Sequence, residues 1–260
     1  MRLLLLRHGI GRSFYLVSKF NRNFFADLFN IFDVTPVYVY RPISVVPATR
    51  SSPKSIAVPF HRNLLFPSEK VIQVPSITSS PDFSSIFKQD HYRDNFSSFN
   101  NLYYQHETLR LGIKGLSLDQ YDLVVCYRDD MILSSRTCLL SELTRATDYF
   151  VTSMFEWHEG VFERFYACPP SVFRSMIVKD HFIYEAYSKS KRRLDSYKYT
   201  GERLAHKVIQ KSRISIWPIP LYTYRVRIGP YMACESNKIR IQDIPLLLPH
   251  LMRKKLSSFF

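Results

Sequence analysis

The chain has 260 residues and a net charge of +14, with 36 Lys and Arg against 22 Asp and Glu. Its hydrophobic content of 46% and aromatic content of 15% suffice for a buried core and exclude wholesale disorder. With 7 glycines, 15 prolines and no internal repeat, repeat and low-complexity classes are excluded as well. We expect one domain over residues 1–260, whose charge favours an anionic partner: nucleic acid, a phosphorylated small molecule or an anionic membrane surface.

The cysteines and apolar runs exclude several further classes. Cys126, Cys138, Cys168 and Cys234 are far apart and form no C-x-x-C pair, which argues against a metal cage or a disulfide framework and fits a reducing compartment. The run Leu3–Leu6 is shorter than the roughly 7–15 apolar residues of a signal peptide, so we interpret it as a first buried strand. No segment approaches the roughly 20 apolar residues of a membrane span.

Strands and helices are predicted to alternate along the chain. Strands are expected at 2–6, 36–40, 71–74, 123–127, 149–152, 162–167 and 214–219. Helices are expected at 14–32, 96–113, 136–147, 169–176 and 201–211, with loops at 7–12, 41–68 and 76–85. This alternation predicts an α/β fold with a mostly parallel central sheet flanked by helices.

The most informative stretch is the end of the strand predicted at 123–127. Its short apolar run breaks directly into Arg128-Asp129-Asp130. Ligands of α/β sheets bind outside the carboxyl ends of strands, and charged groups there are costly to desolvate without a partner. A divalent cation (Mn or Mg), a diphosphate and sugar hydroxyls would together provide that partner. The alternative interpretation is a salt-bridged surface turn.

The same stretch resembles a glycosyltransferase motif. Many bacterial and viral capsular or lipopolysaccharide transferases have a mid-chain strand of the form Tyr-Asp, three apolar residues, Arg-x-Arg-x-Asp-apolar. The positions that fit this form are Tyr121, Asp122, Arg128, Asp130 and Met131. Cys126 stands where the family has its first arginine, so any role of that arginine is absent here.

Further pieces resemble the family in the same order along the chain. They are the opening strand with Gly9 and Arg12, the helix at 101–109, Trp157 with 163–166, and the helix start at 201–204. The match is loose but collinear over roughly residues 1–227. The resemblance implies a GT-A-like nucleotide-binding sandwich for the whole chain.

Site residues follow from this resemblance by position. Arg7, Gly9 and Arg12 would hold the nucleotide, because they follow the first strand. Asp130, with Asp129 second, would bind the metal or the sugar.

The remaining charged positions of the motif have alternative roles. Arg128 would contact phosphate or sugar. Glu163 or Glu202 would act as acceptor base or sugar contact, although Glu202 could instead stabilise a helix start through the macrodipole. Arg164 would bind the donor or simply pair with Glu163.

The implied function is transfer of a sugar from a nucleotide-diphosphate-sugar donor to a glycan or lipid-linked acceptor in surface polysaccharide synthesis. The expected location is the cytoplasm, with peripheral contact at the membrane inner face. The tail at 244–260 mixes apolar and basic residues, which suits either a membrane contact or a helix packed on the domain.

Two other classes remain open. Arg7-His8-Gly9 resembles the opening motif of histidine phosphatases, in which a histidine is phosphorylated and arginines clamp the phosphate. The arginine-bearing helix and the late His-Gly or His-Ala strand of that family are missing. A non-enzymatic basic binding protein would explain the charge, but no nucleic-acid recognition motif is present, so nucleic acid is not the expected partner.

Overall fold

The structure is a computed structural model. It describes residues 1–9, 14–42, 45–46, 56–57, 66, 68–135, 139–155, 157, 160–226, 232–234, 248–250 and 252. The strands are β1 (Arg2–Gly9), β2 (Asp33–Tyr40), β3 (Val45–Val46), β4 (Ile56–Ala57), β5 (Lys70–Gln73), β6 (Leu123–Arg128), β7 (Met131–Ser135), β8 (Tyr149–Ser153), β9 (Phe165–Cys168), β10 (Ser215–Ile219), β11 (Leu221–Val226) and β12 (Met232–Cys234). The helices are α1 (Phe14–Phe25), α2 (Leu28–Ile31), α3 (Phe83–Ile86), α4 (Ser97–Ile113), α5 (Leu139–Leu143), α6 (Pro170–Met176), α7 (His181–Ser190) and α8 (Gly201–Ser212), with 3-10 turns at Leu118–Gln120, Thr144–Thr147 and Ser196–Tyr199.

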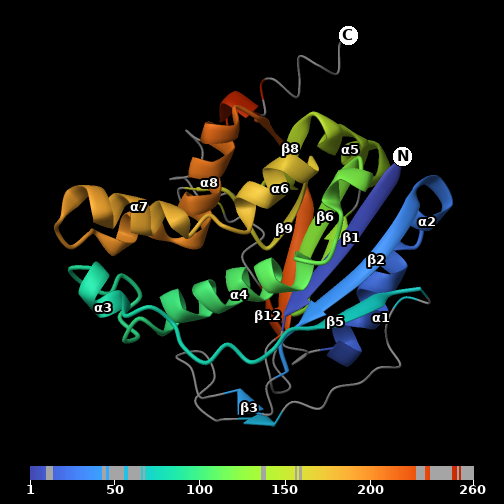
Figure 1. The fold of residues 1–260 in the computed structure, drawn as a ribbon. Helices are drawn as coiled ribbons and strands as arrows, with labels where there is room; N and C mark the ends of the chain where they lie inside the picture. Colours follow the sequence, from blue (N-terminus) through green and yellow to red (C-terminus); the bar gives the residue numbers. More distant parts are fainter. Residues whose placement is uncertain are drawn as a thin grey trace.

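A seven-stranded sheet in the order β10-β8-β9-β6-β1-β2-β5 forms the centre of the molecule (Figure 1). Pairing is parallel at every step except those flanking β9, which runs against β6 and β8. The predicted α/β fold with a mostly parallel central sheet is therefore confirmed. Its order and single reversed strand agree with the GT-A-like sandwich that the resemblance implies.

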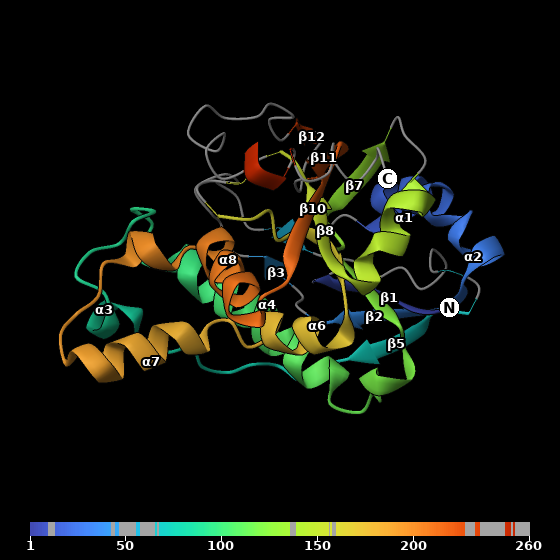
Figure 2. The same cartoon turned by 90° about the horizontal axis from the view of Figure 1, so that it is seen from above.

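The central strands are buried on both faces. Leu3–Leu6 in β1 and Leu123–Cys126 in β6 are almost fully buried, as near-continuous apolar runs in a covered parallel sheet should be. Figure 2 shows α4, α6 and α8 on one face, and α1 with the strands β7, β11 and β12 on the other. Gly112 lets α4 pack closely, because a Cβ there would lie 2.2 Å from Val39 Cγ1.

A second sheet continues directly from the first. β7, β11 and β12 form a three-stranded antiparallel sheet, and β7 begins at Met131, immediately after Asp129 and Asp130. Buried Asn21 of α1 ties β7 in place: its amide donates to the Met131 carbonyl (2.7 Å) and its oxygen accepts from Leu133 N (3.0 Å). The two aspartates thus lie where the chain passes from one sheet to the other.

A separate apolar cluster lies beside the sheet. It is built from α3, the first half of α4, α7, the turn Ser196–Tyr199 and Leu204 of α8. Figure 2 shows these helices projecting to one side of the central sheet. The cluster places the start of α8 next to the strand ends described below.

Several sequence predictions differ from the structure. Arg7, His8 and Gly9, predicted as a loop, continue β1. All three pair with β2, and Arg7 and His8 also pair with β6. The helix predicted at 14–32 is two helices, α1 and α2. Between them, the carbonyl oxygens of Ala26 and Asp27 accept hydrogen bonds from the N–H groups three residues later. α7, β7, β11 and β12 were not predicted from the sequence. β7 was missed because it follows charged residues without a turn signal.

Other boundaries shifted in smaller ways. In the described part of the helix predicted at 136–147, α5 is followed by a 3-10 turn, and the strand predicted at 162–167 begins at Phe165. The region 41–68, predicted as irregular, contains the short β3–β4 ladder. Most of the tail at 244–260 lies outside the described residues, and its predicted membrane or packing role is untested.

Candidate active site at the carboxyl ends of β1 and β6

Asp129 and Asp130 directly follow β6, beside the end of β1. They are 3% and 1% exposed, and Asp129 N donates to the His8 carbonyl oxygen (2.8 Å). β2 and β5 lie on one side of β1 and β6 on the other, so the strand order reverses at this point. Open α/β sheets bind ligands at such a reversal. The sheet therefore brings two carboxylates to the position where a ligand is expected.

Arg128 neutralises Asp130 within the chain. Its Nε and NH2 donate to the two Asp130 carboxylate oxygens at 2.9 and 2.7 Å. Burial opposes the charge of Arg128, but Asp130 outweighs it and raises the pKa of the guanidinium. Bidentate pairs of this kind are geometrically specific. Arg128 therefore orients the carboxylate and stabilises its charge.

Asp129 is held by β2 and by a glycine of β1. The Tyr38 hydroxyl donates to Asp129 Oδ2 (2.9 Å), and burial, reinforced by Asp129, raises the pKa of Tyr38. A Cβ on Gly9 would lie 1.9 Å from Asp129 Oδ1, and Gly9 has φ +157°. Only glycine leaves room for the carboxylate at this position.

Arg7 packs on the Tyr38 ring, on the same side of the site as Asp129. It is 3% exposed, lies 4.0 Å above the Tyr38 ring and donates to Glu69 Oε2 (2.9 Å). No motif singled out Tyr38, which lies in β2, or Glu69, which directly precedes β5. Their role depends on parallel pairing of strands that are distant in sequence.

Glu163 and Lys179 form a buried ion pair on the other side of the site. Their side chains are 13% and 5% exposed. Burial tends to raise the pKa of Glu163, but Lys179 and then His106 outweigh it, so that pKa lies below its usual range. A Cβ on Gly201 would lie 2.0 Å from Glu163 Oε1, so the start of α8 packs directly on this carboxylate.

Arg164 and Glu202 lie beside that pair, with Arg164 NH2 3.9 Å from Glu202 Oε1. Within the described chain Glu163 forms its ion pair with Lys179, which is more deeply buried than Arg164, while Arg164 adds a smaller electrostatic contribution to Glu163. Gly160 approaches the Glu202 backbone closely, since a Cβ there would lie 2.2 Å from the Glu202 carbonyl carbon.

The reversed strand β9 joins the two sides. Because β9 is antiparallel to β6, its beginning lies at the carboxyl end of β6. Arg128 N donates to the Arg164 carbonyl oxygen (3.1 Å), and the Thr152 hydroxyl lies 2.7 and 2.9 Å from the Phe162 and Phe165 carbonyl oxygens. These contacts fix the segment that carries Glu163 and Arg164.

Most predicted site residues therefore gather at one edge of the sheet. Those that the structure describes at this edge are Arg7, Gly9, Arg128, Asp129, Asp130, Glu163, Arg164 and Glu202. Arg12 lies outside the described residues. Asp122, another part of the family-like motif, lies at the opposite edge, where it accepts from Arg2 N (2.7 Å) and supports the fold.

Two histidines lie within this edge. His8 is 5% exposed, its Nδ1 has no hydrogen-bond partner within the described part of the chain, and burial, with help from Arg128, lowers its pKa to about 3. His106 is also buried, with its pKa lowered chiefly by burial. His8 is buried to a similar degree as Asp129 and Asp130, so exposure does not separate the phosphatase interpretation from the transferase one. The phosphatase interpretation is disfavoured by the missing arginine-bearing helix and late histidine strand of that family.

The described residues contain no group of three His, Cys, Asp or Glu side chains that could hold a metal ion. Mg²⁺, however, is commonly bound through one or two carboxylates together with substrate phosphates. Adjacent Asp129 and Asp130 fit that mode as a pair. Such an ion would neutralise a diphosphate leaving group.

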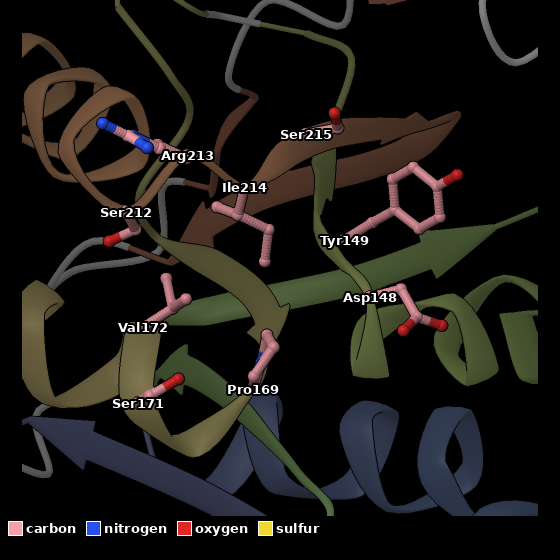
Figure 3. Close-up of a pocket in the computed structure, with 9 residues that line it drawn as sticks. All are labelled: Asp148, Tyr149, Pro169, Ser171, Val172, Ser212, Arg213, Ile214 and Ser215. Atoms are coloured by element: carbon pink, nitrogen blue, oxygen red, sulfur yellow. The ribbon is translucent and has the colours of Figure 1, made fainter.

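An open depression of about 410 Å³ lies at the opposite edge of the sheet (Figure 3). Its lining consists of Asp148, Tyr149, Pro169, Ser171, Val172, Ser212, Arg213, Ile214 and Ser215. These residues start β8 and β10 and follow β9. It contains none of the predicted site residues and is separate from the carboxylate edge.

Comparisons with known proteins leave the family open. No protein-family model matches the chain, and no curated protein matches it. Among solved structures, the galactosyltransferase LgtC in complex with donor and acceptor sugar analogs is similar at 12% identity and a TM-score of 0.36, covering 76% of this chain and 69% of that chain. An active-site mutant of LgtC is similar at 11% identity and a TM-score of 0.34, with the same coverages.

Identities and TM-scores this low do not support an assignment of the fold, which therefore rests on the sheet topology. Among the described helices, none is long and apolar enough to cross a membrane.

Proposed function

We propose that this chain is a glycosyltransferase. It would transfer a sugar from a nucleotide-diphosphate-sugar donor to a glycan or lipid-linked acceptor in surface polysaccharide synthesis, working in the cytoplasm or at the inner face of a membrane through peripheral contact. The observation that carries this proposal is the buried Asp129–Asp130 pair at the strand-order reversal, with Glu163 and Glu202 on the adjoining segments.

The donor side of the reaction is assigned to the β1–β6 edge. Asp130 and Asp129 would hold a divalent cation, which supplies charge neutralisation of the diphosphate when bound. Arg128 orients Asp130 through its bidentate contact. Arg7 and Gly9 line the end of β1 beside Asp129, where the nucleotide would lie.

The acceptor side is assigned to the β9 and α8 segments. Lys179 holds Glu163 in its ionised form, which can accept a hydrogen bond or a proton from an acceptor hydroxyl. Glu202 at the start of α8 is the second carboxylate in reach of such a hydroxyl, and Arg164 balances its charge.

Thermal unfolding with nucleotides tests the proposal. UDP, GDP and CMP are added with and without Mn²⁺ to the wild type and to the Asp130→Asn and Asp129→Asn variants. Ligand at about 100 times its Kd should stabilise the native wild type by about 2.7 kcal/mol. We expect one nucleotide to raise the melting temperature in a Mn²⁺-dependent manner, and both variants to lose this response.

A matched control is Asp148→Asn, which removes an exposed carboxylate at the opposite edge of the sheet and should respond as the wild type does. No shift with any nucleotide would overturn the proposal. A shift with phosphate or vanadate that depends on His8 would replace it with the phosphatase function.

A further inference from the structure

A group of basic side chains lies on α8 and on the turn before it. We define the cationic surface as Lys198, Arg203 and Lys207 with the exposed ring of Tyr197. Tyr197 is 37% exposed, and Lys198 is exposed as well. Arg203 and Lys207 are one helical turn apart, about 6 Å along the axis. Figure 2 shows α8 beside the sheet, at the base of the projecting helices.

Aromatic rings fix two of these cations. Arg203 Cζ lies 3.7 Å from the centroid of Tyr197, and Lys207 Nζ lies 3.9 Å from the centroid of Tyr199. Cations over ring faces are attracted by the ring quadrupole without being neutralised. The rings thus limit the motion of both side chains while the positive charge remains.

Counter-charge next to the cationic surface comes from Asp195, whose side chain accepts a hydrogen bond from Tyr197 N (3.2 Å). Lys198 and Lys207 form no ion pair with the part of the chain that the structure describes. Burial lowers the pKa of Lys207, and the charges of Arg203 and Lys198 lower it further. Like charges held together in this way repel each other, and an anionic ligand would relieve that repulsion.

The cationic surface is continuous with the acceptor side of the site. Arg203 directly follows Glu202, which faces Arg164. The His91 ring lies 4.8 Å from the Tyr197 ring, and the next residue, Tyr92, has its pKa raised by burial and then by Glu202. One connected stretch therefore runs from the carboxylates to the cations.

We infer that the cationic surface binds an acidic sugar of the acceptor, one that carries a carboxylate or phosphate group, a few residues from the reacting hydroxyl. The inference rests on the proposed function and deepens it by naming the acceptor class. The exposed Tyr197 ring offers apolar area for the C–H face of a sugar, and Lys198 and Lys207 offer donors to its acidic group. A cluster one helical turn long suits a short acidic segment of glycan, whereas a nucleic acid or a membrane would need a broader basic face.

Calorimetric titration of the full chain tests the inference. The probes are hexagalacturonate, which carries a carboxylate on each sugar, and neutral maltohexaose. The test variant is Lys198→Gln/Lys207→Gln, and the control is Lys191→Gln/Arg192→Gln, which removes the same charge from an exposed run after α7. The test variant should bind hexagalacturonate about tenfold more weakly, because it loses two cationic contacts, and the control should bind it as the wild type does.

A second variant, Arg203→Gln, removes the cation that lies over the Tyr197 ring and should show a similar loss of hexagalacturonate affinity. Equal affinity in the wild type and the test variant would overturn the inference, as would equal affinity for both hexasaccharides. Tighter binding of a dT hexanucleotide or of phosphatidylglycerol vesicles than of hexagalacturonate, lost in the test variant, would also overturn it.

The same titration separates the two proposals. If hexagalacturonate binding depends on the cationic surface but no nucleotide stabilises the protein, the glycan surface stands and the transferase proposal fails. If a nucleotide with Mn²⁺ stabilises the protein but hexagalacturonate does not bind, the acceptor class alone is wrong.

Discussion

Replacing Lys179 by Met should leave the buried Glu163 carboxylate without its ionic partner. The two side chains are 5% and 13% exposed, so solvent cannot take over the role of the ammonium. Breaking a buried pair by removing one partner costs about 3–5 kcal/mol. We expect about 3 kcal/mol, the lower end, because Arg164 and the remaining exposure of Glu163 soften the loss.

The pH dependence of this loss follows from the pKa of Glu163. In the wild type that pKa is lowered, so the pair stabilises the fold above the usual glutamate value of about 4.3 and this contribution is lost as pH falls through the folded value. In Lys179→Met, burial is left as the dominant influence and should raise the pKa instead. The deficit is then largest at neutral pH and shrinks as acid protonates Glu163.

Urea unfolding at pH 7 and pH 5 measures this directly. Lys179→Met/Glu163→Gln should recover much of the stability lost in Lys179→Met, because no buried charge then remains unpaired. The matched control is Lys189→Met, whose pair with Glu185 is exposed to solvent and should contribute little to stability. A Lys179→Met protein as stable as the wild type, or one whose deficit is the same at both pH values, would refute the reasoning.

Three further predictions concern neighbouring residues. Gly9→Ala should abolish the Mn²⁺-dependent nucleotide shift, because its Cβ would lie 1.9 Å from Asp129 Oδ1; an unchanged shift would show that this carboxylate is not needed. The free energy of unfolding of the wild type should fall by up to about 5 kcal/mol between pH 6.5 and about 3, because His8 binds a proton in the unfolded chain but not in its buried folded position. Urea titrations of His8→Gln should show a smaller fall over the same pH range. Asn21→Ala should cost about 2–4 kcal/mol in urea unfolding, because two buried backbone groups of β7 lose their partner, whereas Asn23→Ala on the exposed side should cost under about 0.5 kcal/mol.

Local patterns in the sequence were enough to predict the buried strands and the charged end of β6. Apolar runs such as Leu3–Leu6 and Leu123–Cys126 are encoded by consecutive residues, and so is their abrupt end at Arg128-Asp129-Asp130. The order of these pieces along the chain predicted a sandwich of the observed kind. These features depend on neighbours in sequence, which a single chain displays directly.

The partners of the site were decided by the tertiary structure alone. The contact of Tyr38 with Asp129 joins residues 91 positions apart, through the parallel pairing of β1 with both β2 and β6. Glu163 pairs with Lys179 rather than the adjacent Arg164, because β9 is reversed and α8 packs on the carboxylate through Gly201. No local pattern encodes which buried charge meets which, since that choice is made by the packing of strands and helices distant in sequence.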